Sequence, residues 1–174
     1  MSKIGAALIK KFIKKAGEKL DGQWVLMGGS LMPFLGASAR VTYDIDLAGF
    51  GKKERAQNLE ILEIAEDLGV SVEAVNQAAG FFLQKIDSWK SDLVVIHQGR
   101  KSTIYRPSAT LYLILKIQRL SESDLEDCLA MLKIAKKVSE DIDRNRLEKV
   151  IRNRKKTADK FVEQRLEKLL ERLT

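Results

Sequence analysis

The chain is poor in the residues that build covalent cross-links and thiolate sites. Cys128 is the only cysteine in its 174 residues, and His97 is the only histidine. A single cysteine excludes an intramolecular disulfide and a cysteine-based zinc site, and it fits a reducing compartment. We expect Cys128 to be a small buried residue on a helix and His97 to have a structural role in a strand.

The sequence also lacks a long uninterrupted apolar segment. Lys10, Lys11, Lys14 and Lys15 interrupt the apolar residues near its start, so neither a membrane span nor the apolar region of a signal peptide is predicted. There is no internal repeat, low-complexity tract or long linker. With 45% apolar and 32% charged residues, the composition is that of a globular protein. We expect a cytoplasmic protein that does not bind membranes.

Positive charge exceeds negative charge, but the excess is uneven along the chain. The net charge is +7. Residues 1–20 carry six basic groups and one acidic group, and residues 144–174 carry eleven basic and five acidic groups. The intervening residues 21–143 carry fourteen basic and eighteen acidic groups. An acidic middle between basic ends is typical of a cation-binding centre flanked by helices that attract phosphate. Lysine-rich helix faces in solvent explain the same pattern, and both interpretations stay open.

The first half of the chain predicts alternating helices and strands. Apolar residues recur every fourth position over residues 4–20, which predicts an amphipathic helix packed on its own domain, or alternatively on a membrane surface. Residues 23–27 predict a buried strand that ends at a glycine turn, after which Ser30 is expected to cap a short helix. Residues 43–50 alternate as a strand, and residues 54–79 predict one or two helices.

The second half begins with short β-rich segments and ends in helices. Residues 81–86, 92–98 and 102–105 predict a small antiparallel extension. Pro107 and Ser108 predict the start of a helix, and Ser123 with Glu126 predicts the capping box of the next one. The tail from Arg144 has apolar residues at helical spacing, with no glycine or proline. The expected fold class is therefore α/β (α+β), with a mixed sheet flanked by helices over residues 1–107 and a C-terminal helical bundle over residues 108–174.

Two acidic residues on the predicted strand 43–50 are candidates for a metal site. Asp44 and Asp46 are two positions apart, so both side chains leave the same face and can converge on one cation. Magnesium prefers such hard oxygen ligands. Gly28, Gly29 and Ser30 lie upstream, where two glycines let the backbone approach an anion and the amides of a helix start point toward it. A solvated acidic pair and an ordinary turn are the alternatives.

Two stretches of the chain resemble known nucleotidyltransferases. The signature of the nucleotidyltransferase superfamily is a Gly-Ser turn followed by a strand with Asp-x-Asp, often with Arg-x-Thr just before that strand. Residues 28–50 resemble this signature, and Arg40 and Thr42 occupy the Arg-x-Thr positions. Residues 113–132 resemble the later motif of the AbiEii-like bacterial family, a lysine helix followed by an Asp-x-x-Asp helix, at Lys116, Asp124 and Asp127. The interval from Lys116 to Asp124 is closer to that of a related bacterial family with the same helices.

The resemblance implies divalent-metal chemistry on a nucleoside triphosphate. Asp44 and Asp46 would ligate Mg²⁺ or Mn²⁺, Lys116 would stabilise the phosphate charge that moves to the leaving group, and Asp124 is the candidate base for the acceptor. Several residues would contact the nucleotide: Gly28, Gly29, Ser30, Arg40, Thr42 and Lys116. Membership of a toxin–antitoxin or abortive-infection system, with a cognate antitoxin as partner, is also implied.

The leading hypothesis is a nucleotidyltransferase that moves a nucleotide from a triphosphate to tRNA or to protein. Many such enzymes use a third carboxylate, for which Asp87 or Asp92 is available, although neither lies in a recognisable motif. That gap favours the alternative, a non-catalytic module of the same fold that binds nucleic acid or a partner protein. A helical interaction protein that pairs through its C-terminal helix is a third hypothesis. The acids near Asp124 also suit an ordinary helix start.

Overall fold

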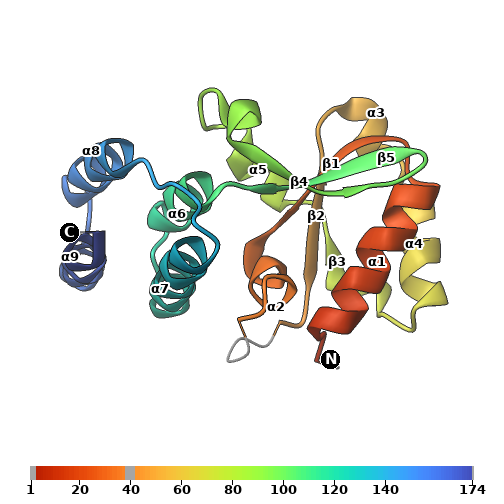
Figure 1. Ribbon diagram of the computed structural model, residues 1–174, viewed down its shortest axis with the longest axis horizontal. Helices are drawn as coiled ribbons and strands as arrows, with labels where there is room; N and C mark the ends of the chain where they lie inside the picture. Colours follow the sequence, from red (N-terminus) through yellow and green to blue (C-terminus); the bar gives the residue numbers. More distant parts are fainter. Residues whose placement is uncertain (1–2, 38–41, 174) are drawn as a thin grey trace. The chain divides into compact units, whose positions relative to one another are not determined.

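The structure is a computed structural model that describes residues 3–37 and 42–173. Its contacts divide the chain into two compact units, Met1–Pro107 (unit 1) and Ser108–Thr174 (unit 2). Unit 1 contains the strands, and unit 2 is helical in its described residues. Figure 1 labels the elements of both units.

Unit 1 is built on a five-stranded mixed sheet with the strand order β3-β2-β1-β5-β4. The strands are β1 (Gly22–Met27), β2 (Ile45–Gly49), β3 (Val75–Asn76), β4 (Leu93–Gln98) and β5 (Ser102–Pro107). The central strand β1 runs antiparallel to β2 and parallel to β5. β3 pairs parallel with β2, and β4 pairs antiparallel with β5. This mixed sheet, flanked by helices, confirms the predicted fold class.

The pairing of β1 with β2 fixes the position of one acidic residue. Trp24 pairs with Gly49, and Met27 pairs with Asp46. Residues that face each other across an antiparallel ladder share a face of the sheet. Asp46 therefore lies on the face of Met27, at the end of β1 where the chain enters its glycine turn.

Helices cover the two faces of the sheet unequally (Figure 1). The helical segments of unit 1 are α1 (Ala6–Lys19), η1 (Gly28–Ser30), α2 (Leu31–Phe34), α3 (Lys52–Arg55), α4 (Asn58–Asp67), η2 (Val72–Ala74), α5 (Ala79–Leu83) and η3 (Trp89–Asp92). α1 buries Ile9, Phe12 and Ala16 against the face that carries Trp24, and α4 packs beside it. The predicted amphipathic helix therefore packs on its own domain. α5 lies on the opposite face, where Gly80 approaches Ala48.

The prediction of a strand over residues 81–86 is wrong, because α5 and the turn after it occupy this segment. A side chain at Gly80 would contact Ala48 at 3.0 Å, so the glycine lets the helix lie close on β2. Only Leu83 is buried, while Phe81 and Phe82 are exposed. The apolar run has neither a clear two-residue nor a clear helical period, and the contact with β2 decides its conformation. The predicted break near Gly69 is present, but β3 replaces the last predicted helical turn.

Unit 2 consists of four helices over its described residues. They are α6 (Ala109–Ile117), α7 (Glu122–Lys137), α8 (Arg144–Lys155) and α9 (Lys160–Leu173). Ser108 caps α6 by accepting a hydrogen bond from the Leu111 amide at 3.2 Å. The tail is helical as predicted, but it is divided between Lys155 and Lys160 without a glycine or proline. Asp159 accepts a hydrogen bond from the Val162 amide at 2.9 Å, so a new cap starts α9 there.

The predicted capping box of α7 is wrong in its residues. Ser121 is the N-cap, and its box partner is Asp124, rather than Ser123 with Glu126. The chain leaves α6 through Leu120, which has a φ of +45°. This turn places Ser121 in extended backbone, where its hydroxyl reaches the Asp124 amide at 3.2 Å. The sequence pattern alone could not locate this turn.

Candidate nucleotide and metal site

The turn after β1 is held tightly to β2. Gly28 has a φ of +58°, a left-handed conformation that favours glycine, and it begins the single turn η1. Ser30 is buried, and its hydroxyl donates to the Met27 carbonyl oxygen at 2.7 Å. The same Oγ accepts a hydrogen bond from the Asp46 amide at 3.3 Å. Ser30 is the N-cap residue of α2, as predicted, but its side chain makes no cap hydrogen bond. It instead ties the turn to the strand that bears the acids.

The Asp46 carboxylate lies against the glycine of this turn. A Cβ atom on Gly28 would collide with Oδ2 of Asp46, so the absence of a side chain makes room for the acid. Oδ1 of Asp46 accepts a hydrogen bond from the Asn76 side chain at 3.1 Å. Asn76 is a site residue that the sequence did not indicate, because it stands on β3, in a stretch predicted to be helical. The Gly28 turn, β2 and β3 thus meet at the Asp46 carboxylate.

Asp44 lies just ahead of β2, because the strand begins at Ile45 rather than at residue 43. Its side chain is exposed, and its backbone is fixed by Thr42. The Thr42 hydroxyl donates to the Asp44 carbonyl at 3.0 Å and lies 3.3 Å from the Asp44 amide. Thr42 is itself held by the Ile4 amide, which donates to its carbonyl at 2.9 Å. Arg40 lies outside the described residues.

The second group of predicted site residues is a buried ionic cluster in unit 2. Lys116 on α6 donates to Oδ1 of Asp124 at 2.9 Å and to Oδ2 of Asp127 at 2.8 Å. Both aspartate side chains are 1% exposed, and that of Lys116 is 12% exposed. An ammonium group shared by two buried carboxylates holds α6 to α7. We call Lys116, Asp124 and Asp127 the Lys116 cluster.

Asp124 is saturated with hydrogen bonds. Arg119 donates to both of its oxygens, at 2.7 and 2.9 Å. The amide and hydroxyl of Ser121 add two further hydrogen bonds at 3.0 and 2.8 Å. Burial would by itself raise the pKa of Asp124, but the hydrogen bonds from Arg119, Lys116 and Ser121 outweigh it and hold the pKa well below its usual range. A carboxylate with so low a pKa is a weak proton acceptor, so this setting favours a structural role over that of a base.

Cys128 follows the Lys116 cluster on α7 and is fully buried, as predicted. Burial raises the pKa of its thiol, and nearby Asp124 and Asp127 add to the rise. The thiol is therefore protonated at neutral pH, and thiolate chemistry is disfavoured.

Comparison with known proteins bears on these residues. A model of the family described as "Nucleotidyltransferase of unknown function (DUF6036)" matches residues 7–172. The chain belongs to this family. Neither the curated proteins nor the solved structures gave a match. The family places the chain among the nucleotidyltransferases and implies a nucleotide as substrate. The matched residues 7–172 include parts of both units, so the Gly28 turn and the Lys116 cluster both lie within the family match.

The carboxylates beside the Gly28 turn fit a magnesium ion in part. Asp44 and Asp46 offer carboxylate oxygens, and Mg²⁺ in nucleotide sites commonly takes its other ligands from water and substrate phosphates. Over residues 3–37 and 42–173, no group of three or more His, Cys, Asp or Glu side chains that could hold a metal is present. Asp87 lies in the turn after α5 and Asp92 ends η3, so neither completes a carboxylate triad in the described part of the chain.

In the portion of the chain that the structure describes, no helix has the length and apolar content needed to cross a bilayer.

Proposed function

We propose that this chain transfers a nucleotide from a nucleoside triphosphate to a macromolecular acceptor, with a divalent metal held by Asp44 and Asp46. The observation that carries the proposal is the meeting of Gly28, Ser30 and Asp46 at one end of β1. The Ser30 hydroxyl lies 3.3 Å from the Asp46 amide, and the Asp46 carboxylate lies against Gly28. A turn suited to anions next to a carboxylate suited to cations is what a metal-bound triphosphate requires.

The protein groups would act by position and charge. Mg²⁺ or Mn²⁺, when bound, would neutralise phosphate charge as the leaving group departs. Backbone amides around Gly28, Gly29 and Ser30 would donate to phosphate oxygens. Asn76 would keep the Asp46 carboxylate oriented through its hydrogen bond to Oδ1. Nucleotide transfer depends on such positioning more than on covalent help from the protein.

The other predicted site residues have different roles in the proposal. Lys116 uses two of its three N–H donors on Asp124 and Asp127, so one donor remains for a phosphate oxygen. Thr42 would set the backbone of Asp44, and Arg40 would contact the triphosphate as the superfamily signature implies. Asp124 would position Lys116 rather than accept a proton. The AbiEii-like relationship, the toxin–antitoxin setting with its antitoxin, and the choice of tRNA or protein as acceptor remain parts of this proposal.

Isothermal titration with Mg²⁺ and each nucleoside triphosphate tests the proposal directly. The wild type should bind at least one triphosphate only when the metal is present. The double variant Asp44→Asn, Asp46→Asn should lose this binding, because the metal loses both charged ligands. The matched control is Glu66→Gln, Glu73→Gln, which removes the same charge from exposed side chains. Absence of binding by the wild type, or equal binding by all three proteins, would contradict the proposal.

A non-catalytic module is the second candidate function. The absence of a triad of possible metal ligands from the described residues favours it. Incubation with labelled triphosphates and total tRNA separates the two candidates. An enzyme with an RNA acceptor adds label to the RNA, whereas a binding module retards the RNA in a gel without labelling it.

A further inference from the structure

The helix α8 presents a basic face that the proposed nucleotide site does not use. Six of its 12 residues are basic and one is acidic. Its inner side buries Leu147 and Ile151. Its outer side, up to the C-cap residue, carries exposed polar residues that we call the α8 stripe: Asn145, Lys149, Arg152, Asn153 and Lys156. Except for the adjacent Arg152 and Asn153, neighbouring members are three or four positions apart. Residues at this spacing follow one another along the same side of a helix.

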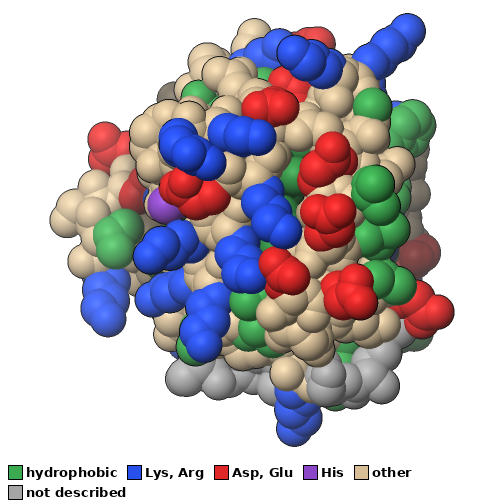
Figure 2. All heavy atoms as spheres, turned by 90° about the vertical axis from the view of Figure 1, so that its right-hand side faces the viewer, with side chains coloured by type: hydrophobic (Ala, Val, Ile, Leu, Met, Phe, Trp, Pro, Cys, Tyr) green, Lys and Arg blue, Asp and Glu red, His purple; other side chains and the backbone are tan. Residues whose placement is uncertain are grey.

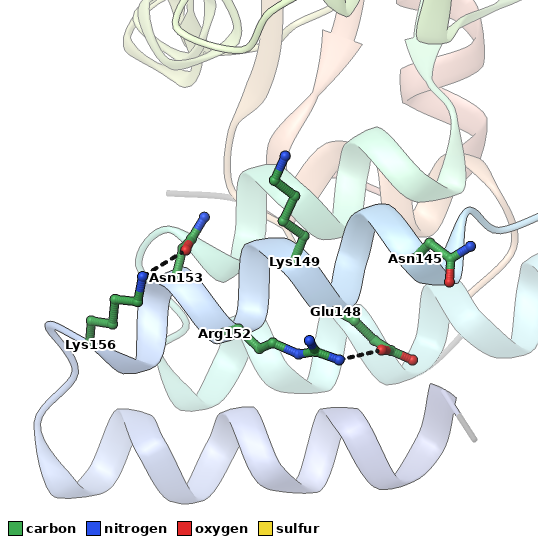
Figure 3. Close-up of a pocket in the computed structure, with 6 residues that line it drawn as sticks. All are labelled: Asn145, Glu148, Lys149, Arg152, Asn153 and Lys156. Atoms are coloured by element: carbon green, nitrogen blue, oxygen red, sulfur yellow. Dashed lines mark hydrogen bonds and ion pairs between the residues drawn. The ribbon is translucent and has the colours of Figure 1, made fainter.

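The α8 stripe lines an open hollow of about 420 Å³, and Glu148 is the other described residue in its lining. Figure 3 shows these side chains leaving one helix. Arg152 donates to Glu148 at 3.2 Å, and Lys156 donates to the Asn153 side chain at 3.3 Å. Lys149 makes no hydrogen bond or ion pair to any described residue, and it extends away from its helix in Figure 3. The described lining of the hollow thus holds three cations and one carboxylate, and only Arg152 is paired with that carboxylate.

Another basic helix, α1, pairs two of its lysines with the neighbouring helix α4, while Lys10, Lys11 and Lys14 make no hydrogen bond or ion pair to a described residue. On α1, Lys15 donates to Asp67 of α4 at 2.8 Å, and Lys19 donates to the same carboxylate at 3.2 Å. Figure 2 shows this side of the molecule, where acidic and basic side chains are interspersed. Such mixed charge is ordinary on a protein surface. The cations of the α8 stripe have one acidic neighbour, Glu148, and so retain a net attraction for anions.

The chemistry of the α8 stripe selects among anionic partners. Its cations recur once per helical turn, about 5.4 Å apart, which matches a polymer that presents phosphates at regular short intervals. The two asparagines can donate to phosphate oxygens and sugar hydroxyls. A lipid surface fits poorly, because the apolar side of α8 is buried in unit 2 and cannot enter a bilayer.

We propose that the α8 stripe binds the sugar-phosphate backbone of a nucleic acid. The contact is electrostatic and does not depend on base sequence. Binding of nucleic acid by the α8 stripe does not require the proposed nucleotide site to be correct. The further statement that this nucleic acid is the acceptor rests on the proposed function, and it makes the acceptor a polynucleotide rather than a protein.

The test measures binding of the full-length chain to a labelled RNA duplex by fluorescence anisotropy, with a DNA duplex of the same sequence in parallel. No metal and no triphosphate are added. The α8 variant is Lys149→Gln, Arg152→Gln, Lys156→Gln. The matched control is Lys10→Gln, Lys11→Gln, Lys14→Gln, which removes the same charge from exposed positions of α1. Circular dichroism melting verifies that both variants are folded.

The wild type should bind with a steep dependence on salt. The α8 variant should bind about tenfold or more weakly, and the slope of log affinity against log salt should fall by about 3, because each of the three lost phosphate contacts removes roughly one unit. The α1 control should stay within about twofold of the wild type, since those lysines lie outside the proposed contact. The proposal is supported if the wild type prefers the RNA duplex, and equally if it binds the RNA and DNA duplexes with the same affinity.

Three results would overturn the proposal. The first is no binding of either duplex by the wild type at low salt. The second is an equal loss in the α8 variant and the α1 control, which would indicate only general charge attraction. The third is binding to vesicles of anionic lipid or to an acidic polypeptide but to neither duplex. Failure of the nucleotide site is recognised separately, because Asp44→Asn, Asp46→Asn should retain duplex binding while losing triphosphate binding.

Discussion

Two pairs of aspartates, each separated by a few residues, have opposite settings in the two units. Asp124 and Asp127 in unit 2 are 1% exposed and share the ammonium group of Lys116. In unit 1, Asp44 is exposed and Asp46 is half-buried beside a glycine turn. A buried carboxylate stabilises a fold only while its cation is present, whereas an exposed one contributes little to stability and remains accessible to a ligand. The contrast separates buried, paired acids from acids that a ligand can reach.

The largest effect on the free energy of unfolding should come from Lys116→Met. This change leaves two buried aspartates without their shared cation and should cost about 3–5 kcal/mol. Urea unfolding followed by circular dichroism measures the loss. Lys133→Met, at an exposed position of α7, is the matched control and should be nearly neutral. A loss no greater than that of the control would remove the distinction between the two pairs.

Asp124→Asn should have the next largest effect, about 2–3 kcal/mol at neutral pH, because several hydrogen bonds to a charged acceptor are weakened. The pKa of Asp124 is lowered in the folded state, so its contribution is present above the unfolded pKa of about 4 and is lost as pH falls below it. The variant should therefore lose less stability than the wild type between neutral and acidic pH. Asp141→Asn, an exposed control, should follow the wild type.

Gly28→Ala should destabilise the chain by about 1–2 kcal/mol, the cost of a side chain in left-handed backbone. Gly69→Ala is the control, because Gly69 has a φ of +64° but open space around it. Gly69→Ala should show the cost of left-handed backbone alone, and Gly28→Ala should lose more stability, because its Cβ would also collide with the Asp46 carboxylate. Triphosphate titration should then distinguish them, since only Gly28→Ala displaces the Asp46 carboxylate. Equal triphosphate affinity in the two variants would argue against a site at this turn.

The smallest effect on stability should come from Asp44→Asn, Asp46→Asn. Asp44 is exposed, and asparagine at position 46 keeps an oxygen that can accept from Asn76, so the free energy of unfolding should change by no more than about 1 kcal/mol. The same urea experiment measures it alongside Lys116→Met. A loss comparable to that of Lys116→Met would show that the acids of unit 1 serve stability, and the comparison between the two pairs would fail.

Several features of the fold could be predicted because local patterns determine them. The apolar stripe of α1, the strand before Gly28 and the helical tail have periodicities that match their conformations. The segment of Phe81 and Phe82 could not be predicted, because its helix depends on the close approach of Gly80 to Ala48 across the sheet. The same holds for β3, which is two residues long and exists only by pairing with β2.

The candidate site was foreseeable in its residue types and less so in its contacts. Gly28, Ser30 and Asp46 could be named because their order and spacing resemble the superfamily signature. The pairing of Ser30 with the Asp46 amide could not, because a serine at that position equally suits a helix cap. Asn76 gave no signal at all, since its role depends on a strand that pairs from thirty residues away.

The sequence by itself determined which segments are amphipathic, where charge accumulates and which family signature the chain carries, because these follow from the order of side chains. Only the tertiary structure decided which acids are buried and paired and which remain exposed. The reason is that the energy of a charge depends on its surroundings. Asp46 and Asp124 are the same side chain, but the register of β1 with β2 sets the surroundings of the first, and the packing of α6 on α7 sets those of the second.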